Sequence, residues 1–159
     1  MTDEDNFAAV VAGAVLRAGD EEIQAEVLND LVANTGSGTT LEKAITDLRT
    51  MERRAGDFGM EIAGSMILPV LIAAASKLWS AYLSRLSEQA GVKLADYTLD
   101  QIKAIAKRIW RSDDTVVSVK EFELFVREAA GKEQLPPDQI DRLVKALHSL
   151  RMEDELSKI

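Results

Sequence analysis

His148 is the only histidine in the chain, so acid–base chemistry by imidazole near neutral pH would depend on it. It lies beside Ser149, in a segment whose apolar residues follow helical spacing. Adjacent residues of a helix point about 100° apart, so His148 does not face Ser149. The chain has no cysteine, and no Gly-x-Ser-x-Gly turn presents another serine. The sequence therefore predicts no catalytic residue, and we expect the protein not to be an enzyme.

Motifs for metals and cofactors are incomplete. Residues 110–121 end like a calcium loop, with an oxygen ligand at Ser118 and an acid at Glu121. Counting back from Glu121 as the twelfth loop position places Trp110 at the first ligand position and Thr115 where the loop needs glycine. A helix-capping box accounts for Ser118 and Glu121 instead. The glycine-rich stretch 36–38 lacks the Gly-Lys of a phosphate loop. We expect neither metal nor cofactor.

The largest basic cluster could bind an anionic partner. Lys103, Lys107 and Arg111 recur every four residues, which places them on one stripe of a helix, with Arg108 beside them. One interpretation is a solvated helix face; the other is a contact for phosphate, an acidic protein or this chain's own acidic N-terminal half. Nucleic acid is disfavoured because the next predicted helix is rich in glutamate, at Glu121, Glu123 and Glu128.

An uncharged run of fifteen residues lies between Glu61 and Lys77, in a chain of which 29% is charged. It predicts a long helix over about residues 59–90 that is apolar on all sides in its first half and kinked at Pro69. Such a helix is buried in a bundle, in an oligomer contact or in lipid.

The first hypothesis is that this helix makes the protein an interaction module, which self-associates or binds a dedicated protein partner. An apolar face left bare by the other helices would be an association site. The residues expected at that contact are Met66, Val70, Ile72, Trp79 and Leu83.

The second hypothesis is a membrane-active effector or toxin component whose apolar helix inserts into lipid. The fifteen uncharged residues alone span about 22 Å, less than the ~30 Å hydrocarbon core of a bilayer. Residues 62–83 would reach about 33 Å, but they include Lys77, which is costly inside a membrane.

The remaining apolar residues also recur at helical spacing, which predicts an all-α bundle of about seven helices around the long one. A loop near Gly91 divides the chain into an N-terminal part, 1–90, and a C-terminal three-helix part, 91–159, unless residues 1–159 form one domain. The tail from Arg151 to Ile159 is predicted to be frayed or a partner contact.

The formal charge of −8 comes mainly from the first forty residues, which carry eight acids and one arginine. This charge favours solubility and repels nucleic acid and anionic lipid. Zero cysteines suit a reducing compartment, and the start of the chain lacks the basic region of a secretory signal. We therefore expect a cytoplasmic protein.

Overall fold

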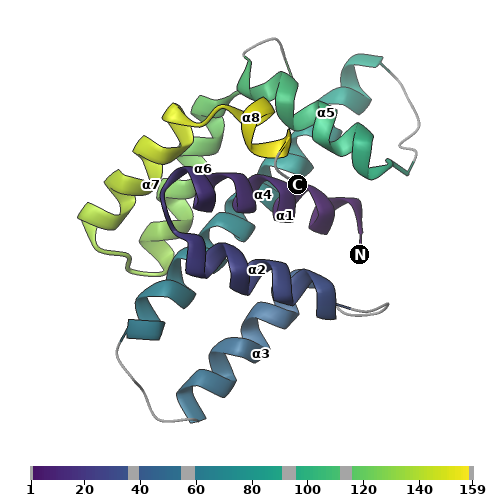
Figure 1. Cartoon of the computed structure of the whole chain (residues 1–159). Helices are drawn as coiled ribbons and strands as arrows, with labels where there is room; N and C mark the ends of the chain where they lie inside the picture. Colours follow the sequence, from purple (N-terminus) through teal and green to yellow (C-terminus); the bar gives the residue numbers. More distant parts are fainter. Residues whose placement is uncertain (1, 36–39, 55–59, 91–95, 112–115, 158–159) are drawn as a thin grey trace.

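The computed structural model describes residues 2–35, 40–54, 60–90, 96–111 and 116–157. Within these ranges the chain forms eight helices and no strand (Figure 1). The predicted all-α bundle with one long apolar helix is confirmed. The eighth helix lies near the C-terminus, in the segment that the sequence predicted to be frayed or a partner contact.

Helix α1 (Asp3–Ala18) shares the centre of the bundle with the long helix (Figure 1). Its N-terminus is capped by the Thr2 hydroxyl, which accepts from the backbone N–H of Asp5 at 3.1 Å. The face that carries Phe7, Val11 and Val15 is buried, and so is the opposite side of small residues. Small side chains allow close approach, so α1 packs against helices on several sides. These are α2 (Glu22–Asn34), α4 (Met60–Ala90), α5 (Leu99–Trp110), α7 (Pro137–Ser149) and α8 (Met152–Ser157).

Helix α4 (Met60–Ala90) is the long apolar helix, and it continues as one element through Pro69. It packs mainly on α1 and on α6 (Val119–Lys132). By length and composition its segment Ile67–Glu88 could span a membrane, yet 56% of its most apolar window is buried inside the fold. In this structure protein rather than lipid therefore covers much of the helix.

Two amphipathic helices, α2 (Glu22–Asn34) and α3 (Leu41–Arg54), cover one side of the α1–α4 pair. At the start of α3 the Thr40 hydroxyl accepts from the backbone N–H of Lys43 at 3.1 Å. The sequence placed this cap at Thr39, which lies outside the described residues. The buried side of α2 includes Leu28, whereas Ile23 is exposed.

The C-terminal helices begin as the sequence predicts. Helix α5 (Leu99–Trp110) opens with a complete capping box, in which Thr98 and Gln101 satisfy each other's backbone N–H groups. The Ser118 hydroxyl caps α6, but the Glu121 carboxylate binds Arg85 of α4 at 2.6 Å instead of completing a box. Helix α7 (Pro137–Ser149) has proline in its first turn.

Helix α8 (Met152–Ser157) holds the C-terminal segment against α1 and α5. Met152 and Leu156 are buried, and the Glu155 carboxylate lies 3.3 Å from Nε of Arg17 at the end of α1. Two buried apolar side chains and a partly buried ion pair offset the weak intrinsic stability of a six-residue helix.

A single hydrophobic cluster runs through the described helices. The sequence suggests a boundary between two parts of the chain near Gly91. The cluster contains residues from both parts, such as Phe7 in α1 and Leu156 in α8. Helix α1 contacts α5, α7 and α8, and α4 contacts α6. The two parts therefore bury their apolar faces against each other.

Candidate functional site

The contact residues predicted on α4 lie mostly inside the fold. Val70, Ile72 and Trp79 are only 0%, 4% and 2% exposed, and Leu83 is partly buried. Met66 belongs to α4, but its side chain is outside the described residues. In this fold, the chain's own helices cover the part of α4 that the sequence proposed as a partner contact.

Trp79 is the centre of an aromatic cluster. Its ring centroid lies 5.0 Å from that of Phe7 in α1, 5.7 Å from that of Tyr82 in α4 and 5.4 Å from that of Tyr97. Tyr97 is fixed by its backbone N–H, which donates to the Asp3 carboxylate at 3.1 Å. The cluster therefore joins α1 and α4 to the segment that precedes α5.

Helix α5 buries one face and presents a row of cations on the other. Its isoleucines belong to the core shared with α1 and α8. Lys103, Lys107, Arg108 and Arg111 follow the opposite side, as the sequence predicts for a single stripe. The capping box fixes where this helix starts.

The four cations differ in their partners. Arg111 pairs with Glu153 of α8 at 2.7 Å. Arg108 donates to the Tyr82 hydroxyl at 3.4 Å, a long and therefore weak hydrogen bond. Within the ranges that the structure describes, no carboxylate pairs with Lys103, Lys107 or Arg108. Three positive charges thus remain uncompensated by an ion pair along this stripe.

A groove of about 570 Å³ lies between the C-terminal half of α4 and α5. It exists because α5 packs on α1 and α8 rather than along α4. Tyr82, Leu86, Tyr97 and Ile105 supply its apolar and aromatic walls.

Three members of the cationic stripe, Lys107, Arg108 and Arg111, also line this groove, whereas Lys103 does not. The groove thus lies between the basic stripe of α5 and the C-terminal half of α4. We call it the α4–α5 groove. The sequence shows each of its walls separately, but Tyr82 and Leu86 precede the start of α5 by thirteen residues or more.

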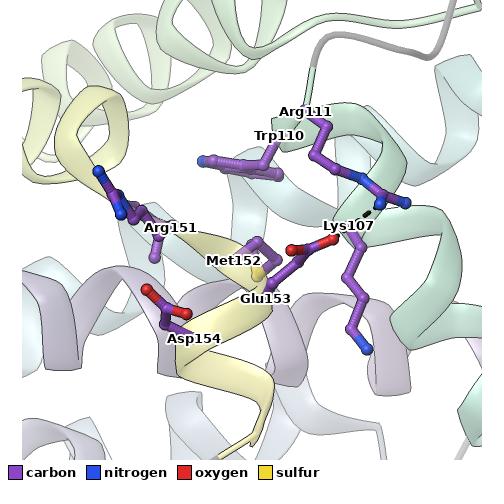
Figure 2. A pocket seen from close by; sticks show the side chains of 8 residues that line it. Lys107, Trp110, Arg111, Arg151, Met152, Glu153 and Asp154 are labelled. Carbon is purple, nitrogen blue, oxygen red and sulfur yellow. Dashed lines mark ion pairs between the residues drawn. The ribbon is translucent and has the colours of Figure 1, made fainter.

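A second, smaller pocket of about 220 Å³ lies between α5 and α8 (Figure 2). Trp110 and Met152 lie across it, and the Arg111–Glu153 ion pair closes one side. The Trp110 indole N–H donates to the carbonyl of Leu147 at 3.0 Å, which fixes the ring. Its volume is below the roughly 300–1,000 Å³ of typical small-molecule sites, so the α4–α5 groove is the stronger candidate.

No protein-family model, curated protein or solved structure gives a significant match to this chain.

The residues considered for catalysis and metal binding lie apart from the groove. His148 is exposed, and its Nε2 lies 2.8 Å from a Glu123 carboxylate oxygen, whereas the Ser149 hydroxyl donates to the carbonyl of Ala146. Residues 112–115 of the calcium-like segment are outside the described residues, and Glu121 at its end pairs with Arg85. In the described part of the chain, no group of three metal-binding side chains occurs.

Two ion pairs hold α4 against α6. The Lys77 ammonium lies 2.8 Å from a Glu128 carboxylate oxygen and 4.9 Å from the centroid of the Phe125 ring. The hydrogen bond from Lys77 lowers the pKa of Glu128 below its ordinary value. On the same side, the Arg85–Glu121 hydrogen bond raises the pKa of Arg85.

Replacing Glu128 with glutamine should flatten the acid side of the stability curve. Glu128 has a lowered pKa in the folded chain, so its stabilising effect is present above its unfolded value, 4.5, and is lost as the pH falls through the lowered folded value. Glutamine does not titrate, so the difference between wild type and variant should shrink from pH 6 toward pH 3.5. Denaturant unfolding at several pH values measures this. Lys77→Gln should reduce the pH dependence of stability over the same range. If the curves of stability against pH for wild type and variant were parallel, the lowered pKa of Glu128 would be contradicted.

Proposed function

We propose that this chain is a non-enzymatic protein–protein interaction module that binds an acidic, amphipathic helix of a protein partner in the α4–α5 groove. The observation that carries the proposal is the combination, in one groove, of an apolar wall with cations that have no carboxylate partner. Tyr82, Leu86 and Tyr97 form that wall, and Lys107 and Arg108 lie beside it.

The shape of the groove supports a helical partner. A groove between two helices accepts a third helix by the ridge-and-groove packing that holds bundles together, and amphipathic helices commonly bind proteins in this way. Tyrosine and arginine are also enriched at protein interfaces, because they combine large contact area with hydrogen bonding.

The charges of the groove support an acidic partner. Lys107 and Arg108 carry no ion pair within the described chain, so partner carboxylates would gain charge-assisted hydrogen bonds without first breaking an internal ion pair. The chain as a whole has a formal charge of −8, so most of its surface repels an acidic partner. The basic stripe attracts such a partner and would orient it toward the groove.

A partner that binds in the groove can contact α4 without displacing the helices that cover its core residues. Binding through Val70, Ile72 and Trp79 would require α4 to leave the helices that cover it. Leu86 lies farther along the same helix, is only partly buried and lines the groove in the folded chain, beside Tyr82, which is 4% exposed. The interaction hypothesis for α4 is therefore best placed at its C-terminal half.

A peptide titration tests the proposal. The probe is a labelled alanine-based helical peptide with glutamates every four residues beside a row of leucines; a second peptide has lysines instead. We expect fluorescence anisotropy to show binding of the glutamate peptide only. Ala104 is exposed and lines the groove, so Ala104→Trp should fill it and weaken binding at least tenfold, about 1.4 kcal/mol, whereas Ala104→Ser should not. Equal binding to Ala104→Trp, or no binding, would overturn the proposal.

Membrane insertion of α4 is the second candidate, because Ile67–Glu88 is long and apolar enough to span a bilayer. Lys77 lies within that segment and pairs with Glu128 in the folded chain, so insertion would break this pair and carry a charge into lipid. Flotation with anionic liposomes, run on the same samples as the peptide titration, separates the two candidates. Protein that remains at the bottom of the gradient supports the groove; protein that floats at pH 7 favours insertion.

A further inference from the structure

We infer that the helix bound in the α4–α5 groove is α2 of a second copy of this chain. This inference rests on the proposed function of the groove and names its partner. It starts from the exposed face of α2, which the fold of a single chain leaves uncovered.

The exposed face of α2 combines acids with one apolar side chain. Glu22, Glu26 and Asp30 recur every four residues along it, and all three are exposed. Ile23 lies beside them and is 79% exposed, the highest exposure among the large apolar side chains of the described residues. An exposed isoleucine bordered by carboxylates is the amphipathic pattern that the groove requires.

The two rows of charge have the same spacing. Glu22, Glu26 and Asp30 form an i, i+4, i+8 series on α2, and Lys103, Lys107 and Arg111 form the same series on α5. Each step advances about 6 Å along a helix axis, so the two rows keep the same spacing when the helices pack side by side, and Glu26 can lie opposite Lys107 in the groove. In that alignment Ile23 would meet the apolar wall of the groove at Tyr82, Leu86 and Tyr97.

Within one chain these two surfaces do not meet. Helix α2 packs on α1, α3 and α4, whereas α5 packs on α1 and α8. Figure 1 shows α2 and α5 on different sides of α1. Contact between the two charged rows therefore requires two copies of the chain.

The resulting association is head-to-tail. The α2 of one copy occupies the groove of the next, so each copy keeps one unused surface until a ring closes or a chain of copies extends. One helix in one groove buries less than a standard interface of about 1,600 Å², so we expect weak association that depends on protein concentration. The exposed charges are screened by salt, so the association should weaken as ionic strength rises.

Light scattering coupled to size exclusion tests the inference, on the whole chain without detergent from about 10 µM to about 1 mM. Wild type should rise above the 17.4 kDa monomer as concentration increases. Lys107→Glu and Glu26→Lys should each weaken association at least tenfold, because each places like charges opposite one another. The double variant that carries both changes should associate again, because it restores opposite charges. Circular dichroism verifies that all variants remain folded.

A matched pair of apolar variants tests the contact without changing charge. Ile23→Ser should weaken association, whereas Leu124→Ser should not, since Leu124 is 58% exposed on α6, outside the proposed contact. A wild type that stays monomeric throughout, or that associates equally with Lys107→Glu and Glu26→Lys, overturns the inference. Neither outcome affects the titration with the glutamate peptide. The self-association inference can therefore fail while the proposal that the groove binds an acidic helix still stands.

Discussion

Replacing Trp79 with alanine should lower the free energy of unfolding by about 3–5 kcal/mol. Trp79 is 2% exposed, and its ring contacts those of Phe7, Tyr82 and Tyr97. Truncation would remove the apolar burial of the indole and leave a cavity where three parts of the chain meet. Chemical denaturation followed by circular dichroism measures the change.

Two controls separate loss of packing from loss of a surface contact. Trp79→Phe keeps an aromatic ring in the cluster and should cost less than the alanine variant. Ile23→Ala removes an apolar side chain that is 79% exposed and should change stability by less than about 0.5 kcal/mol. If Trp79→Ala left stability unchanged and altered only association, Trp79 would be a contact residue, and the core position described here would be wrong.

Replacing Met152 with alanine should lower the free energy of unfolding by about 2–5 kcal/mol, even though it lies in a helix of only six residues. Met152 is 2% exposed, between α5 and α1, and it lies opposite Trp110 across the small pocket (Figure 2). Its loss removes one of the two buried apolar anchors of α8. Urea unfolding measures the effect.

The neighbouring residue offers a control for Met152. Glu153→Gln alters an exposed residue of the same helix and breaks only the ion pair with Arg111, whose side chains are half exposed. We expect it to cost less than about 1 kcal/mol. If Met152→Ala were as mild as Glu153→Gln, α8 would be a frayed tail, one of the two interpretations that the sequence alone suggested.

The position of α8 also bears on the groove. Helix α8 packs on the side of α5 that faces the core, and Arg111 and Glu153 join the two helices at 2.7 Å. Helix α8 thus helps to fix the position of α5, which forms one wall of the α4–α5 groove. Loss of Met152 should therefore weaken binding of the glutamate peptide as well as the fold, since preorganised sites bind more tightly.

Much of the local structure could be predicted from the sequence. Apolar spacing identified α1 to α7, and the box at Thr98 and Gln101 located the start of α5. These features depend on residues within a few positions of each other, so local chemistry determines them. Helix α8 was missed because a six-residue helix is not stable alone and forms here through contacts with α1 and α5.

The candidate site could be predicted only in part. The stripe of Lys103, Lys107, Arg108 and Arg111 is a pattern on one helix and is visible in the sequence. The other wall of the groove contains Tyr82 and Leu86 of α4. The sequence pattern predicts only that these side chains face the core. Only packing shows that these two positions border a groove, whereas Trp79, on the same helix, does not line it.

By itself the sequence determined the helical class, the helix boundaries that carry caps, the cationic stripe and the presence of one unusually apolar helix, because each is encoded by neighbouring residues. Tertiary structure alone decided which side of α4 is covered, that α1 shares the centre, that α8 folds, and that α4 and α5 leave a groove between them. These features depend on contacts between distant segments, because burial is a property of the assembled helices and not of any one of them.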